Sequence, residues 1–272
     1  MRATQASKTM RIAALGAALL ASAGCGRVVS AAEAQGKMTK QQAETVKQSP
    51  PAQIPLGPAG QQIRLGQRIF ERTPRYAAPY VGNQMNCADC HLQGGREPYS
   101  APLVGVPGMF PAYSQRAGRT ITLAERIQEC FARSENGRPP AADGRVVMAL
   151  LAYMDWLSQG QTRGVPYPGR GLVDLPQLQG DAGRGAILYA QQCSVCHGDQ
   201  GAGMPPIFPP LWGPTSFNDG AGMSGVQKMA KFVQHNMPQN APGSLSAQQA
   251  YDLAAYIEAK PRPRLNPAYR KY

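Results

Sequence analysis

The pattern Cys-x-x-Cys-His occurs twice in this chain of 272 residues. In this pattern two thiols form thioethers with the vinyl groups of haem, and the adjacent imidazole binds the iron. A redox-active thiol pair or half of a zinc site would use the same cysteines, but two complete copies in equivalent places behind a signal-like segment favour haem. The sequence therefore predicts two covalently bound haem c groups. The expected attachment residues are Cys87, Cys90, His91, Cys193, Cys196 and His197.

Both motifs lie within the same order of sequence parts. A short helical pattern precedes each motif, and an amphipathic helical pattern follows it. These patterns cover 66–70 and 146–158 in the first copy, and 185–189 and 247–259 in the second. Few alternating β-branched runs occur anywhere. We therefore expect an all-α fold with two class I cytochrome c-like domains in tandem, each holding one haem.

Pro/Gly-rich stretches at 48–60 and 159–183 indicate the domain boundaries. We expect an N-terminal cytochrome c domain over 55–160 that is catalytic, and a linker over 161–180. A C-terminal cytochrome c domain for electron transfer should follow over 181–263, with a tail at 264–272.

The N-terminus is typical of a secretory signal peptide. Arg2, Lys8 and Arg11 precede an apolar run over 12–23 that is too short to span a bilayer. We expect cleavage between 34 and 35, after Ala32-Glu33-Ala34. The alternative is lipoprotein-type cleavage between 24 and 25, which would leave a lipid anchor on Cys25. Either site predicts a periplasmic protein with no transmembrane helix in the mature chain.

The formal charge of +12 suits nucleic acid, an anionic membrane surface or small anionic substrates. Export argues against nucleic acid, and no block of like charges stands out. A generally basic surface is the alternative to a dedicated anion site.

The distal ligand of the second haem has several candidates in this sequence. The segment 224–238 begins with a capping-box pattern at Ser224, continues as a helix to about Gln234 and cannot extend through Pro238. Met237 follows that helix and is the favoured ligand. The other candidates are His235, Met223 and Met204.

For the first haem, the unpaired Cys130 is the candidate ligand. Thr122 and Glu125 form a capping-box pattern for a helix that should stop at 136–137. Arg126, Cys130 and Ser134 then share one stripe of that helix. A buried core cysteine is the alternative to a thiolate ligand. A thiolate would lower the potential of this haem, making it the reactive centre.

Several longer strings are specific to one family. They include the segments 73–83, 125–137, 209–223 and 235–238. Over roughly 60–263 the sequence resembles the thiosulfate dehydrogenases, dihaem cytochromes that join two thiosulfates into tetrathionate. The resemblance implies an oxidoreductase whose electrons leave through the second haem to a c-type cytochrome or similar acceptor.

The resemblance also implies the ligands and the substrate residues. His91 and Cys130 would bind the first iron, and His197 and Met237 the second. Some members have a lysine where this chain has Asn236, so ligand exchange by lysine is not expected. Catalytic roles are implied for Cys130, Arg126, Ser134 and Arg116, with Arg138 or Arg145 as a further basic contact.

Three other functions fit parts of the pattern. A plain dihaem electron carrier would use both haems without a substrate, and a haem subunit of a sulfur-oxidising complex would act on a carrier protein. A dihaem peroxidase fits less well, because the chain is short for that family and lacks a spare histidine for the family's usual arrangement. The physiological direction, thiosulfate oxidation or tetrathionate reduction, is left open.

Overall fold

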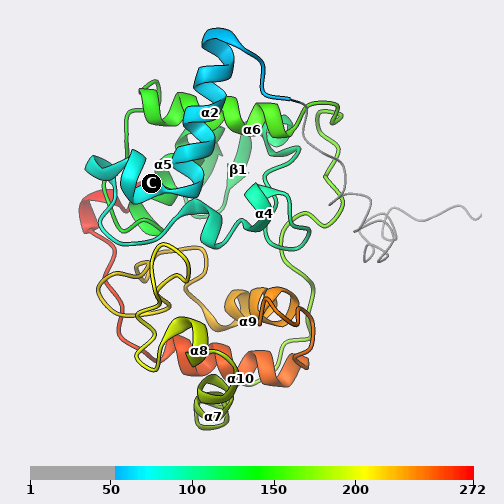
Figure 1. Ribbon diagram of the computed structural model, residues 1–272, viewed down its shortest axis with the longest axis vertical. Coiled ribbons are helices and arrows are strands. Elements are labelled where there is room, and N and C mark those ends of the chain that lie inside the picture. The colour runs from blue at the N-terminus through cyan, green and yellow to red at the C-terminus, as the bar shows by residue number, and fades with distance from the viewer. Residues whose placement is uncertain (1–52) are drawn as a thin grey trace, which may run out of the picture. The chain divides into compact units, whose positions relative to one another are not determined.

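The computed structural model describes residues 53–272 (Figure 1). The expected signal peptide and both of its cleavage positions lie outside these residues. All described residues belong to one compact unit. No helix within 53–272 has both the length and the apolar composition needed to cross a membrane.

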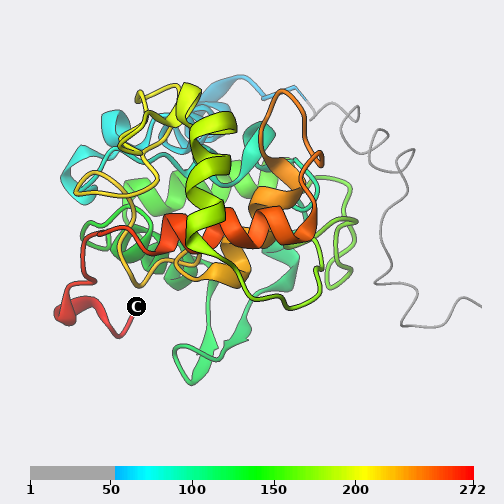
Figure 2. The ribbon, with the colours of Figure 1, turned by 90° about the horizontal axis from the view of Figure 1, so that it is seen from below.

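Each half of the chain is organised around a pair of crossed helices. In the first half α2 (Gly57–Glu71) packs against α6 (Arg145–Leu157), and in the second α7 (Ala182–Gln192) packs against α10 (Ala247–Glu258). Figure 2 shows α7 crossing α10, which also packs against α9 (Val226–Asn236). The four helical patterns that flank the motifs are thereby confirmed.

Glycine makes both crossings close enough to pack. A Cβ on Gly66 would lie 2.0 Å from the carbonyl oxygen of Ala149, and one on Gly185 would lie 2.0 Å from that of Asp252. No side chain fits at such distances, so backbone contacts backbone at both positions. The two glycines occupy equivalent places, which agrees with the repeated order of sequence parts around the two Cys-x-x-Cys-His motifs.

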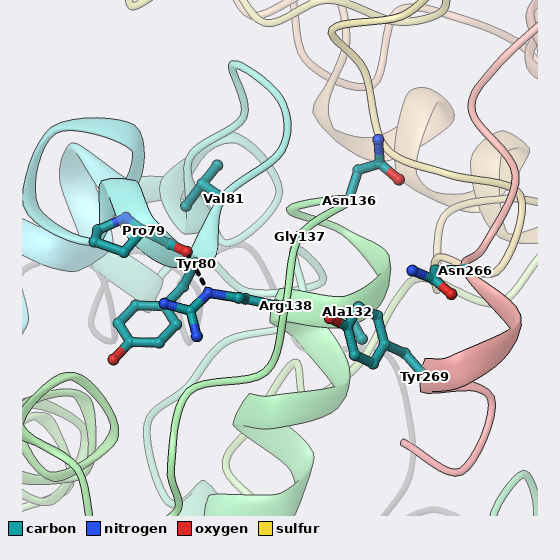
Figure 3. Close-up of a pocket in the computed structure, with 9 residues that line it drawn as sticks. All are labelled: Pro79, Tyr80, Val81, Ala132, Asn136, Gly137, Arg138, Asn266 and Tyr269. Atoms are coloured by element: carbon teal, nitrogen blue, oxygen red, sulfur yellow. Dashed lines mark hydrogen bonds between the residues drawn. The ribbon is translucent and has the colours of Figure 1, made fainter.

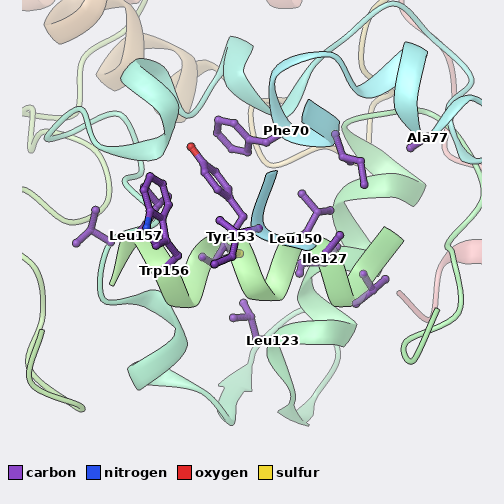
Figure 4. Close-up of a cluster of buried hydrophobic side chains, with 14 of the residues drawn as sticks. Phe70, Ala77, Leu123, Ile127, Leu150, Tyr153, Trp156 and Leu157 are labelled. Atoms are coloured by element: carbon purple, nitrogen blue, oxygen red, sulfur yellow. The ribbon is translucent and has the colours of Figure 1, made fainter. Parts of the chain in front are cut away.

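Two separate hydrophobic cores lie behind these crossings. Figure 4 shows the first, in which Phe70 of α2 packs with Tyr153 and Leu150 of α6 and with Ile127 of the neighbouring α5 (Leu123–Arg133). The second core is built mainly from α7, α9 and α10, with the fully buried Tyr189 and Tyr251 among its members. Each half therefore has its own core.

The remaining elements are short, apart from α5 (Leu123–Arg133). A two-stranded antiparallel hairpin, in which Ala112 pairs with Ile121, is the one sheet in the described part of the chain and was not expected from the sequence. The others are α3 (Thr73–Tyr76), η2 (Ala78–Tyr80), η3 (Cys87–Asp89), α4 (Leu92–Gly95), η4 (Val106–Met109), β1 (Ala112–Ser114), β2 (Arg119–Ile121), α8 (Ser194–His197) and η5 (Pro267–Tyr269).

One expected helix start is confirmed and one is wrong. The Thr122 hydroxyl accepts from the Glu125 backbone N–H at 3.2 Å, and the Glu125 carboxylate accepts from the Thr122 N–H at 2.7 Å. At α9 the capping box expected at Ser224 is not formed, since Gly225 is the N-cap. The Gly225 N–H instead donates to the Glu258 carboxylate of α10 at 3.0 Å, so the helix starts one residue later than expected.

The C-terminal end of α5 is held by side chains from both halves of the chain. Asn218 donates from its amide nitrogen to the Ala132 carbonyl at 2.9 Å, and its backbone N–H donates to the Arg133 carbonyl at 3.2 Å. Asn83 donates to the Ser134 carbonyl at 2.7 Å. These bonds satisfy carbonyls that a helix end leaves without partners. The position of α5 therefore depends on a loop of the second half.

The helix crossing generates a prediction for Gly185→Ala. The added methyl group would force α7 away from α10, so the free energy of unfolding should fall by about 2 kcal/mol or more. Denaturant unfolding of the holoprotein measures it. Gly183→Ala, in the same helix but facing only the Asp181 side chain at 3.2 Å, should change it by less than about 1 kcal/mol. Equal effects of the two variants would contradict the crossing argument.

A second prediction concerns the cap on α5. Asn218 is 1 % exposed, and Asn218→Ala leaves the buried Ala132 carbonyl without this donor. We expect a loss of about 1–3 kcal/mol in the free energy of unfolding. Asn266→Ala is the matched control, because that exposed side chain caps only the short η5. If the unfolding curve of Asn218→Ala matches that of the wild type, the Asn218 cap contributes nothing to the free energy of unfolding.

Candidate functional site

The first Cys-x-x-Cys-His motif lies in the wall of a large cavity. The cavity measures about 800 Å³, within the range of sites for cofactors and substrates. Its walls are largely apolar, with Phe70, Leu150 and Met154 from the first core among them. Phe217, Ala221 and Phe232 contribute from the second half, so both halves of the chain build this cavity.

The structure brings most of the expected first-site residues together here. The helical stripe expected on α5 is formed, and its three members line the cavity across two turns of helix. Ser134 is the C-cap residue of α5. The expected residues that line the cavity are Cys87, Cys90, His91, Arg116, Arg126, Cys130 and Ser134.

Both motif histidines are oriented by the same kind of hydrogen bond. His91 Nδ1 lies 2.6 Å from the Ala101 carbonyl oxygen, and His197 Nδ1 lies 2.9 Å from that of Pro209. A carbonyl can only accept, so Nδ1 carries the proton and Nε2 keeps its lone pair. Burial also lowers the pKa of both rings, which favours the neutral form that binds metals.

Cys130 lies among opposing influences on its thiol. Burial raises its pKa, and the nearby acids Glu129 and Glu135 add to that rise. The guanidiniums of Arg126 and Arg116 act against the rise by favouring the thiolate. The thiol forms no disulfide with any other cysteine of residues 53–272. The arrangement suits a sulfur whose charge is stabilised either by these cations or by a bound metal.

Arg116 reaches the cavity from the turn between β1 and β2, whereas Arg126 comes from α5. Both guanidiniums meet the same buried carboxylate. Glu129 Oε2 lies 2.5 Å from Arg126 Nη1 and 3.9 Å from Arg116 Nη1. The hairpin that the sequence did not predict is thus what places one of the two expected anion-binding arginines.

The second motif lies against the second core. Cys193 and Met237 both pack against that cluster, and Met237 is the C-cap residue of α9. Among the rival candidates, Met223 packs against the same cluster. Met204 is 55 % exposed, and Met223 also lines the first cavity. The His235 ring packs edge-on against Tyr99 with centroids 5.0 Å apart.

The first cavity fits a bound haem by its chemistry as well as its size. Glu135 is 2 % exposed, lines the cavity and leaves its Oε2 without a hydrogen-bond partner. Burial, and then the charge of Asp89, raise its pKa well above the usual range. An orphaned polar atom beside two attachment cysteines and a pre-oriented imidazole is what a site filled by a further group leaves.

Sequence reasoning missed several residues of this cavity. Glu129 and Glu135 are the sequence neighbours of Cys130 and Ser134 in the segment 125–137. Nothing in that segment distinguishes these two acids from acids that face solvent. Lys228 lines the cavity from α9 and Arg170 from the linker. Phe217 and Met223 belong to the family-specific string 209–223, which was the available signal.

The two further arginines that the sequence suggested do not line this cavity. Arg138 lies in a separate pocket of about 290 Å³, shown in Figure 3, where its Nε donates to the Pro79 carbonyl at 2.8 Å. Its guanidinium stacks on the Tyr80 ring, 4.7 Å from the centroid. Arg145 begins α6 and lines neither cavity.

Two family models match this chain, one in each half. "SoxA/TsdA, cytochrome c domain" matches residues 74–162, and "Cytochrome C oxidase, cbb3-type, subunit III" matches residues 180–257. Each matched range contains one Cys-x-x-Cys-His motif. The chain therefore has two cytochrome c domains and carries two covalently bound haem c groups, as the sequence predicted.

Curated relatives match over most of the chain. "Thiosulfate dehydrogenase" of Stutzerimonas stutzeri is 46 % identical over 217 residues, which cover 78 % of this chain and 71 % of the relative. The protein of the same name from Allochromatium vinosum is 43 % identical over 222 residues, covering 78 % and 82 %.

A solved structure shares the fold. "Thiosulfate dehydrogenase (TsdBA) from Marichromatium purpuratum" in its "as isolated" form superposes with a TM-score of 0.77 at 39 % identity. The match covers 85 % of this chain and 52 % of that one, so the chain spans about half the length of the solved protein. On the identity and coverage of the curated relatives, this chain belongs to the thiosulfate dehydrogenase family.

Proposed function

We propose that this protein oxidises thiosulfate and joins two molecules of it into tetrathionate in the first cavity. The observation that carries the proposal is the meeting, in one cavity, of a Cys-x-x-Cys-His motif, the unpaired Cys130 and two arginines. A plain electron carrier has no need for such an anion site. The names of the curated relatives support the same reaction.

We assign the expected ligands to the two haems. In the first domain His91 and Cys130 would bind the iron, with Cys87 and Cys90 as the attachment residues. In the second domain His197 and Met237 would bind the iron, attached through Cys193 and Cys196. When bound, each haem supplies a centre that accepts one electron at a time.

Electrostatics explains why arginines are needed at the site. Two thiosulfate dianions 5 Å apart repel by about 13 kcal/mol at an effective dielectric constant near 20. Arg116 and Arg126 provide planar, paired donors for the sulfonate oxygens, and Ser134 provides a hydroxyl. These groups would bind the two anions with their outer sulfurs close to Cys130.

The chemistry balances without any proton. The outer sulfur of one thiosulfate forms a bond to Cys130 Sγ, and two electrons leave. The outer sulfur of the second thiosulfate then attacks the thiosulfate-derived sulfur of this adduct and expels the Cys130 thiolate. One sulfur–sulfur bond has formed between two thiosulfates, and the two electrons pass to an external acceptor such as a c-type cytochrome. The reverse sequence would reduce tetrathionate.

The proposal also assigns a function to each domain and places the protein in the periplasm. The catalytic domain would comprise 55–160 and the electron-transfer domain 181–263, joined by the linker 161–180. The signal-like pattern at Arg2, Lys8 and Arg11 supports export to the periplasm. Mass analysis of the mature protein would distinguish cleavage after residue 34 from a lipid anchor on Cys25.

The proposed reaction predicts that thiosulfate alone reduces the protein. Adding thiosulfate to the oxidised holoprotein should produce tetrathionate and shift the haem absorption bands to their reduced positions. The bands shift because, with no external acceptor added, the electrons from thiosulfate pass to the haems. Sulfate, which has a similar charge and no oxidisable outer sulfur, is the control. Bands that do not shift with thiosulfate would contradict the function and favour a plain carrier.

The variant Cys130→Ser tests whether the Cys130 sulfur is needed for turnover while the haem attachment residues are kept. We expect both haems to stay attached while turnover falls at least about 100-fold, because the variant lacks the sulfur that ligates iron and accepts the thiosulfate. The haem-to-protein ratio measures attachment, and the absorption spectrum should lose its iron–thiolate features. Turnover close to that of the wild type would end the assignment of Cys130.

A further inference from the structure

A buried carboxylate lies between the two arginines of the first cavity. The Glu129 side chain is 3 % exposed and contacts Arg126 at 2.5 Å and Arg116 at 3.9 Å. Burial raises the pKa of Glu135, the other acid of the cavity wall, which favours its neutral form, whereas Glu129 forms ion pairs. A negative charge in a site for dianions opposes substrate binding, so its presence requires an explanation.

The first part of the explanation is alignment. Arg116 comes from a hairpin turn and Arg126 from α5, and each guanidinium ends a long, flexible side chain. Two such cations repel each other, so without an anion between them they would not stay aligned. Glu129 is buried on the rigid α5 helix, so its oxygen is a fixed anchor that both guanidiniums can approach.

The second part is charge. Arg116 and Arg126 together carry two positive charges, and Glu129 reduces this sum to one. The proposed product, tetrathionate, is itself a dianion that must leave before the next cycle. A carboxylate beside the arginines weakens the binding of every dianion, including the product, while it keeps the donors in place.

We propose that Glu129 is a positioning residue that holds Arg116 and Arg126 together and limits how tightly the site binds dianions. This inference rests on the proposed function of the first cavity. Glu129 acts through the two arginines and is not itself assigned a contact with substrate.

The test compares anion binding and turnover in Glu129→Gln. The amide keeps the size of the side chain but removes its charge. At roughly 6 Å the lost repulsion corresponds to at least about tenfold tighter binding of a dianion, which is the value for fully water-screened charges. Calorimetric titration of the oxidised holoprotein with sulfate should show this tightening. With thiosulfate, kcat should fall about tenfold or more while KM falls, because the arginines lose their anchor and anions leave slowly.

Two matched variants separate charge from structure. Glu125→Gln removes a carboxylate from the same helix, where it pairs with Arg119 at 2.8 Å outside the cavity, and should leave the sulfate affinity within about twofold of the wild type. Glu129→Asp keeps the charge on a shorter side chain. It should keep the sulfate affinity close to that of the wild type while kcat falls.

The outcomes distinguish this inference from the proposed function. If Glu129→Gln folds with unchanged haem spectra and its sulfate affinity and kcat match the wild type, the inference is overturned while thiosulfate oxidation stands. If Glu129→Gln fails to fold, an unchanged kcat in Glu129→Asp overturns it instead. If the wild type is not reduced by thiosulfate, the proposed function fails, and the sulfate affinities alone still decide the role of Glu129.

Discussion

The position of one helix is the constraint on which the first site depends. Helix α5 carries Arg126, Cys130 and Ser134 on a single stripe, and a rotation or shift of this helix would move all three together. Its start is set locally by the Thr122 capping box. Its end is set by Asn83 and by Asn218, which comes from the other cytochrome domain. These three residues are thus held by ordinary helix-end hydrogen bonds, two of them made across the domains.

This arrangement changes what the second domain contributes. In a simple tandem of cytochromes, each domain would enclose its own haem and the second would only receive electrons. Here the 209–223 loop caps α5 and also places Phe217 and Met223 in the wall of the first cavity. The duplication is visible in the paired glycine crossings and in the matched histidine hydrogen bonds. The two copies differ in the 209–223 loop, through which the second domain closes the cavity of the first.

Part of the cationic charge in the wall of the first cavity is paired with other groups of the protein. Arg116 and Arg126 face one ion-paired acid, Glu129, while burial of Glu135 favours its neutral form. Of the other cations in the wall, Arg133 donates to the backbone carbonyls of Gly220, Arg270 and Tyr272. Its charge therefore serves structure. Arg170 and Lys228 also line the wall, so the cavity keeps a cationic character.

The sequence by itself determined the features that depend on near neighbours in the chain. The haem motifs span five residues each, the α5 stripe repeats every four, and the four flanking helices follow their own apolar patterns. Tertiary structure decided the rest. The hairpin that delivers Arg116, the meeting of two arginines at Glu129, the exclusion of Arg138 and Arg145, and the N-cap at Gly225 in place of Ser224 all depend on contacts between distant segments. Local patterns are set by the backbone geometry of one element, whereas partners across the chain exist only once the elements have packed.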